Sequence, residues 1–172
     1  MTIQSATHPV TRSTTWVNPG APERQRIMQR TGSVAMVGAS PNPARSSYFV
    51  LTYLRADSDF RLYLINPTLP EGSEILGLPV YPRLDALPEV PDLVDVFRRV
   101  DDLPTVADEA IAAGAGTLWF QLGLRHDGAA QKAHDAGLTV VADRCLKIEH
   151  ARFHGGLHLA GFDTGVISSR RR

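Results

Sequence analysis

The sequence predicts an α/β fold of three layers, in which helices cover both faces of a mostly parallel central sheet. Short apolar runs such as 33–38 alternate along the chain with longer segments whose apolar residues recur at helical spacing. The short runs are apolar throughout, as in strands that are covered on both faces. Strands that alternate with helices in this way form βαβ units with parallel strands and right-handed crossovers. The expected architecture is therefore Rossmann-like.

The first half of the chain supplies two helices and two clear strands. A helix is expected over 22–30, because Pro22 suits a first helical position and Glu23 suits the first turn. A strand over 33–38 precedes a helix over 46–56, whose apolar residues lie at helical spacing. A second strand over 60–66 ends in Asn-Pro. The segment 74–82 is a connection broken by Gly and Pro, in which one short strand is expected around Val80.

The second half continues the alternation. A buried strand is expected over 93–97, and a helix over 101–114 opens with acidic residues and closes with glycine. Strand 117–123 ends on glycine, helix 127–137 stops at Gly137, and 138–143 is the last clear strand. We therefore divide the chain into a flexible N-terminal arm (1–21), one folded domain (22–150) and a Gly-rich C-terminal tail (151–172).

Composition narrows the classes of function. The 172 residues include 18 Lys+Arg and 18 Asp+Glu, and this neutral balance counts against a general nucleic-acid surface. A single cysteine excludes an intrachain disulfide and favours a reducing cytoplasm. No apolar run approaches the roughly 18 residues of a membrane span, and no secretory signal core is visible at the N-terminus. We expect a cytoplasmic monomer or small homo-oligomer.

Ligands of open parallel sheets bind outside the carboxyl ends of the strands. After the first strand, Gly38 allows close backbone approach, Ser40 offers a hydroxyl, and Arg45 adds a positive charge before the next helix. The N-terminus of that helix presents free N–H groups to an anion. The loop sequence therefore predicts a phosphate site. The alternative is a simple βα turn that binds no ligand, with a serine cap and a surface arginine, because such a turn would have the same residues.

Two other strand ends carry informative residues. Asn66 stands where an NAD enzyme usually places a carboxylate for the ribose, which counts against NAD, while Asn-Pro is also a common turn. Arg98 and Arg99 follow the strand 93–97, and guanidinium groups match phosphate oxygens with paired hydrogen bonds. The same arginines also have nearby partners in Asp101 and Asp102.

Five segments in this order, VGASPNPARSSYFVLTYL, INP, DLVDVFRR, WFQLG and AGLTVVADRCLKIEH, resemble the small bacterial and archaeal CoA-binding proteins. The resemblance covers about residues 30–150. It implies a Rossmann-like domain, similar to the CoA-binding domain of the succinyl-CoA synthetase alpha subunit, that binds coenzyme A or an acyl-CoA with no assigned reaction. The positions that match the family's motifs are Gly38, Ala39, Ser40, Pro43, Arg45, Ser46, Ser47, Asn66, Pro67, Phe97, Arg98, Arg99, Gln121 and Gly123.

Two functions other than CoA binding remain as alternatives. An NADP-dependent oxidoreductase needs a hydride acceptor and a proton donor, and the sequence offers neither. A regulatory or assembly subunit would use the nucleotide-binding fold to bind another protein. No catalytic set is identifiable, so we expect a binding protein rather than an enzyme.

Two further side-chain types invite a function. His150, His154 and His158 are spaced by four, but Gly155 and Gly156 interrupt a helix there, so we expect surface histidines and no metal site. Cys145 is either a reactive thiolate favoured by Arg144 and Lys147 or a small buried side chain, and we expect burial.

Overall fold

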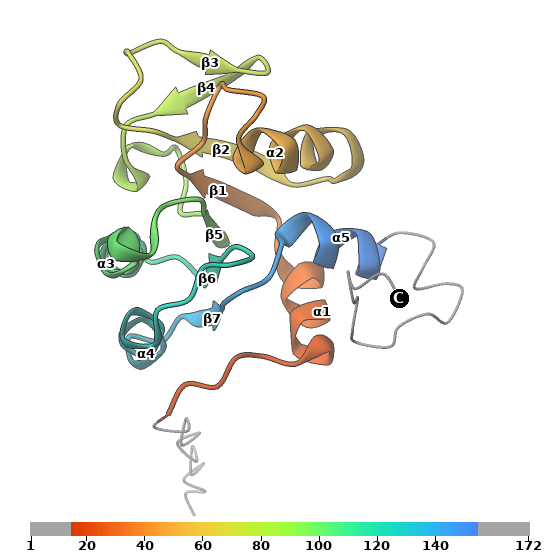
Figure 1. Cartoon of the computed structure of the whole chain (residues 1–172), viewed down its shortest axis with the longest axis vertical. Helices are drawn as coiled ribbons and strands as arrows, with labels where there is room; N and C mark the ends of the chain where they lie inside the picture. Colours follow the sequence, from red (N-terminus) through yellow and green to blue (C-terminus); the bar gives the residue numbers. More distant parts are fainter. Residues whose placement is uncertain (1–14, 155–172) are drawn as a thin grey trace, which may run out of the picture.

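The computed structural model describes residues 15–154, which form a seven-stranded sheet in the order β3-β4-β2-β1-β5-β6-β7 (Figure 1). The strands are β1 Ser33–Val37, β2 Arg61–Ile65, β3 Glu74–Ile75, β4 Leu78–Tyr81, β5 Leu93–Val96, β6 Thr117–Phe120 and β7 Thr139–Val141. All pairings are parallel except that of β3 with β4. The predicted Rossmann-like α/β fold is confirmed. The strand order reverses at β1, which has β2 on one side and β5 on the other, and such a switch point is where open sheets bind ligands.

Helices cover both faces of the sheet (Figure 1). They are α1 Ala21–Arg30, α2 Ser46–Asp57, α3 Leu103–Ala113, α4 Asp127–Asp135 and α5 Leu146–His154, with short 3-10 turns at Leu84–Ala86 and Val100–Asp102. The alternating side chains of β1 separate the two core layers: Ala35 packs on the α3/α4 side, and Met36 packs on the side of α1, α2 and α5. None of the helices within residues 15–154 is long and apolar enough to cross a membrane.

The segment before α1 is fixed to the sheet, so the flexible arm expected over 1–21 is wrong for residues 16–20. Trp16 is buried, and its Nε1 donates to the carbonyl of Val140 at 3.0 Å. The Asn18 amide donates to Ala142 O and accepts from Ala142 N, each at 2.9 Å. Asn18 thus imitates a neighbouring strand beyond the edge strand β7, where unpaired backbone groups are otherwise exposed. Residues 1–14 of the expected arm lie outside the described residues.

The helix α5 was not expected from the sequence. It runs back along the face that α1 and α2 cover, and it includes residues 151–154, which we had assigned to the tail. Its buried face carries Leu146 and Phe153 but also Glu149, His150 and Arg152. Three polar residues on a buried face hide the apolar periodicity on which a sequence-based prediction depends. The remainder of the expected tail, 155–172, lies outside the described residues.

Candidate functional site

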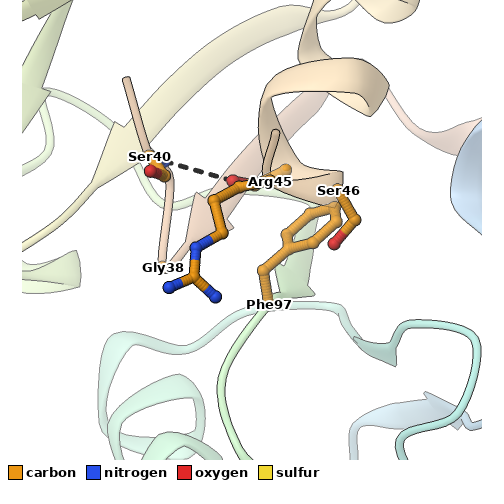
Figure 2. Close-up of a pocket in the computed structure, with 6 residues that line it drawn as sticks. Gly38, Ser40, Arg45, Ser46 and Phe97 are labelled. Atoms are coloured by element: carbon orange, nitrogen blue, oxygen red, sulfur yellow. Dashed lines mark hydrogen bonds between the residues drawn. The ribbon is translucent and has the colours of Figure 1, made fainter. Parts of the chain in front are cut away.

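The loop between β1 and α2 borders an open pocket at the carboxyl edge of the sheet (Figure 2). The pocket has a volume of about 170 Å³ and is lined by Gly38, Ser40, Arg45, Ser46, Ser47 and Phe97. The Arg45 and Ser46 side chains are exposed, and the Arg45 guanidinium extends toward Gly38 in Figure 2. The structure therefore brings together six of the residues that the sequence nominated, from two neighbouring strand ends.

Side chains of the loop hold its own backbone in shape. Ser47 is buried, and its hydroxyl accepts a hydrogen bond from Ser40 N at 3.1 Å, drawn as a dashed line in Figure 2. The Ser40 hydroxyl accepts from Asn42 N at 3.2 Å, and the Asn42 side chain accepts from Ala44 N at 2.9 Å. No side chain of residues 15–154 caps the N-terminus of α2. The N–H groups of Ser46 and Ser47 therefore remain available to an anion in the pocket, whereas those of Arg45 and Tyr48 already donate to backbone carbonyls.

The fold requires glycine at position 38 even without a ligand. Its φ is +87°, and a Cβ at this position would lie 2.5 Å from the carbonyl oxygen of Phe97 and 3.0 Å from the Arg98 side chain. We had expected the missing side chain to make room for a pyrophosphate. The contact with Phe97 shows that glycine is needed first to let the ends of β1 and β5 approach each other.

Asn66 lies beside the loop without lining the pocket. Its amide nitrogen donates to the carbonyl of Ala39 at 2.8 Å, and its amide oxygen accepts from Thr68 N at 2.9 Å. Both ends of the amide are thus engaged in tying the end of β2 to the loop. Pro67 and Pro43 are exposed, and Ala39 is buried beneath the loop.

The two arginines after β5 differ in their surroundings. Arg98 is half-buried, and its Nη2 lies 3.1 Å from Oδ2 of Asp102, although without the orientation of a hydrogen bond. Arg99 is exposed and forms no ion pair with any residue in the range 15–154. From the sequence the two arginines could not be distinguished. In the structure Arg98 lies beside Asp102, whereas Arg99 has no ion-pair partner among residues 15–154.

Gln121 and Gly123 make contacts within the protein and do not line the pocket. The buried Gln121 donates from Nε2 to Oδ1 of Asp95 at 2.7 Å. Gly123 N donates to Oδ1 of Asp143 at 2.7 Å. Asp143 has a φ of +54°, an unusual conformation for a residue with a side chain, and it directs the chain from β7 into the turn before α5.

The buried carboxyl of Asp95 is a feature that we did not single out from the sequence. Asp95 lies in the middle of β5 and is fully buried, and its Oδ2 has no hydrogen-bond partner among residues 15–154. Burial raises the pKa of Asp95 to about 8, against the smaller lowering effect of the hydrogen bonds from Gln121 and the Val96 backbone. The carboxyl is therefore mostly neutral at pH 7.

Asp95 should make stability depend on pH. In the unfolded chain an aspartate ionises near pH 4, whereas the folded protein keeps this proton up to a pH of about 8. The folded state thus binds more protons in this window, so stability falls as the pH rises, by at most about 1.4 kcal/mol per pH unit. The Asp95→Asn variant cannot ionise at this position. Its free energy of unfolding in urea should therefore rise relative to that of the wild type as the pH increases from 4 to 8. A stability difference that is the same at both pH values would contradict the assignment.

The N-termini of α2 and α5 lie close together on one face of the sheet. Lys147, in the first turn of α5, places its Nζ 4.1 Å from the centre of the Phe49 ring, which belongs to the first turn of α2 and is 61% exposed. The two helices contact each other and lie on the same side of the sheet in Figure 1. Lys147 therefore places a cation beside the first turn of α2, and neither Lys147 nor Phe49 was among the predicted site residues.

Cys145 directly precedes α5 and is half-buried. Burial raises the pKa of its thiol more than the backbone N–H groups of Ile148 and Lys147 lower it, and the smaller effects are a rise from Asp95 and a lowering from the charge of Lys147. The raised pKa counts against the alternative of a reactive thiolate beside Arg144 and Lys147, and the burial that we expected is partial.

The expectation of surface histidines is wrong for His150 and holds for His154, which is exposed. His150 is buried; its Nδ1 lies 3.0 Å from the Tyr53 hydroxyl, and its ring stacks on His154 at 4.5 Å. Desolvation lowers the pKa of His150. Within residues 15–154 no group of three or more His, Cys, Asp or Glu side chains is arranged to hold a metal ion, and His158 lies outside that range.

Comparison with known proteins relates this chain to a protein family. The model of the CoA binding domain matches residues 32–151. The uncharacterised protein YneT of Bacillus subtilis (strain 168) is 36% identical over 134 residues, which cover 78% of this chain and 96% of that protein. A hypothetical protein from Pyrococcus horikoshii OT3 has a TM-score of 0.71 and 32% identity, covering 88% of this chain and 100% of that chain. Cell-free ID.343 from Thermus thermophilus has a TM-score of 0.73 and 33% identity, covering 78% and 99%.

Proposed function

The chain belongs to the CoA binding domain family, and from this premise we propose that it binds coenzyme A or an acyl-CoA at the pocket between the β1–α2 loop and the end of β5. The observation that carries the proposal is the uncapped N-terminus of α2, with the exposed Arg45 and Ser46 beside it. Helix N-termini bind phosphate because their N–H groups point outward and the helix dipole favours negative charge.

The charge of the cleft fits this ligand. CoA carries a pyrophosphate and a ribose 3′-phosphate, about four negative charges in all, and it needs several cationic partners. Arg45 stands at the pocket, Arg99 follows β5 with no ion pair among the described residues, and Lys147 lies in the first turn of α5. We assign the pyrophosphate to the α2 N-terminus and the 3′-phosphate to Arg99.

The remaining motif residues act on the shape of the site. Ser47 and Asn66 hold the loop through the hydrogen bonds to Ser40 and Ala39, and the prolines stiffen it. A loop that is already ordered loses less conformational entropy when the ligand binds. We propose residues 22–150 as the CoA-binding domain, to which Trp16–Gly20 and the end of α5 add structural support.

Removing Arg99 should weaken CoA binding. A charge-assisted hydrogen bond contributes about 1.5–3 kcal/mol, so Arg99→Ala should raise the dissociation constant for CoA by about ten- to a hundredfold. The effect on dephospho-CoA should be much smaller, because that ligand lacks the 3′-phosphate. Isothermal titration calorimetry with CoA, dephospho-CoA and NADPH measures both effects and tests the NADP reading as well.

Arg26→Ala is the matched control, because Arg26 is an exposed arginine of α1 whose partner is Glu23. Its affinity for CoA should equal that of the wild type. An unchanged affinity in Arg99→Ala would remove Arg99 from the site. No heat of binding with CoA in the wild type, or tighter binding of NADPH than of CoA, would overturn the proposed function.

A further inference from the structure

A second cavity lies at the amino edge of the sheet, opposite the proposed CoA pocket. It is bordered by the ends of α1 and α2, the segment that leads into β2, and α5. Ser46 lines the CoA pocket and Asp57 lines this cavity, so the twelve residues of α2 separate the two sites by about 17 Å. The volume of about 440 Å³ is in the range of small-molecule sites.

Two helices end at this cavity. Gln29 and Asp57, in the last turns of α1 and α2, are among its lining residues. The N–H groups of Gly32 and Ser33, which would continue the hydrogen bonds of α1, donate instead to Oδ2 of Asp92 at 2.8 and 2.9 Å. The last carbonyls of α1 therefore keep no helical partner, and the negative ends of two helix dipoles favour a cation in the cavity.

The carboxylates of Asp57 and Asp59 add two negative charges. Both residues are exposed, and neither carboxylate forms an ion pair or a hydrogen bond within residues 15–154. None of the described residues that line the cavity is a lysine or an arginine. Asp57 is also the last residue of α2, where the helix dipole disfavours an anion. A bound cation would relieve this repulsion.

His150 supplies a buried polar group to the same cavity. Its Nδ1 lies 3.0 Å from the Tyr53 hydroxyl, its ring stacks on that of His154 at 4.5 Å, and the Phe60 ring meets it edge-on at 5.2 Å. Nε2 has no hydrogen-bond partner in the described part of the chain. Burial lowers the pKa of His150, so the ring is neutral at pH 7. When Nδ1 carries the proton and donates to Tyr53, Nε2 is free to accept a hydrogen bond.

We propose that this cavity binds a small aliphatic diamine; the inference goes beyond the CoA site and does not depend on it. One ammonium group donates to the carboxylates of Asp57 and Asp59, and the other donates to Nε2 of His150 and to the carbonyls at the end of α1. Met28 and Phe60, which also line the cavity, contact the methylene chain. A bare metal ion fits less well, because no three His, Cys, Asp or Glu side chains among residues 15–154 are arranged to hold one.

The test is isothermal titration calorimetry of the full chain at low salt and about pH 8, where primary amines are still charged. The probes are diaminobutane, aminobutanol and butanediol, in which hydroxyl groups replace the ammonium groups one at a time. We expect one diaminobutane per chain, binding about ten- to a hundredfold weaker for aminobutanol, and no measurable heat with butanediol. No heat with diaminobutane, equal affinity for all three probes, or binding of Zn²⁺ in place of the diamine would overturn the proposal.

Variants locate the ligand. Asp57→Asn and Asp59→Asn should each weaken diaminobutane binding about tenfold or more, while their affinity for CoA equals that of the wild type, because neither residue lines the CoA pocket. Glu109→Gln is the control: Glu109 is an exposed carboxylate of α3 that does not line the cavity, and its variant should bind the diamine normally. Wild-type affinity in both Asp variants would exclude this cavity as the site.

The ring nitrogens of His150 provide a second readout. Nitrogen-15 NMR of the wild type with diaminobutane should show the tautomer with a proton on Nδ1 and none on Nε2, because Nε2 accepts from the ammonium group. A proton on Nε2 in the complex would overturn the role that we give to His150.

Discussion

Glu149→Ala should lower the free energy of unfolding by about 3–5 kcal/mol, the usual cost of removing one partner of a buried ion pair. Glu149 and Arg24 are almost fully buried, and Arg24 Nε donates to Glu149 Oε2 at 2.8 Å. The other carboxylate oxygen, Oε1, accepts from Arg152 Nη1 at 3.3 Å. Alanine would leave buried guanidinium charge without its carboxylate between α1 and α5, since Arg24 lies on α1. Urea unfolding followed by circular dichroism measures the loss.

An exposed pair of the same length provides the control for this prediction. Arg83 Nε lies 2.8 Å from Asp85 Oδ1, but both side chains are about 70% exposed. Asp85→Ala should change stability by no more than about 1 kcal/mol, because water screens exposed pairs. Glu149→Gln keeps the shape and loses the charge, and it should fall between the other two variants. Equal losses in Glu149→Ala and Asp85→Ala would mean that burial does not govern the energy of these pairs.

The elements with strong apolar patterns were predicted well from the sequence. The strand expected over 33–38 is β1 at Ser33–Val37, and the helix expected over 46–56 is α2 at Ser46–Asp57. In both, apolar burial and local propensity agree. The helix α5 was missed because its partners are distant: Arg24 meets Glu149 across 125 positions of sequence, so Glu149 looks like an ordinary surface carboxylate when it is read locally.

In the candidate site, too, the features set by neighbouring residues in the sequence were predicted, and those set by residues distant in the sequence were not. The loop Gly38–Ser47 was identified because its Gly, Ser, Pro and Arg residues stand together in the chain. The roles of single motif residues could not be read in this way. Gln121 was named as a site residue, yet its side chain turns inward to Asp95. Lys147 meets Phe49 of α2 only because α5 folds back beside α2. Side-chain direction at a strand end depends on contacts that only the tertiary structure supplies.

Gly38→Ala should destabilise the protein by about 2–6 kcal/mol and abolish CoA binding in any fraction that still folds. A non-glycine residue in an unfavourable backbone conformation costs about 1–3 kcal/mol, and φ at this position is +87°. The added Cβ would also lie 2.5 Å from the backbone oxygen of Phe97. Since backbone cannot move aside as a side chain can, the ends of β1 and β5 must separate, at a further cost of about 1–3 kcal/mol.

Gly72→Ala separates the two contributions to this loss. Gly72 has a φ of +82°, close to that of Gly38, but a Cβ there would meet no atom within 4 Å. Its variant should therefore lose only the conformational part, about 1–3 kcal/mol, and should bind CoA as the wild type does, because Gly72 lies in the turn before β3 and not at the pocket. Urea unfolding of both variants gives the difference, and calorimetry gives the affinity. If Gly38→Ala loses no more stability than Gly72→Ala, the contact between β1 and β5 tolerates a side chain; if it also binds CoA normally, the loop is not the phosphate site.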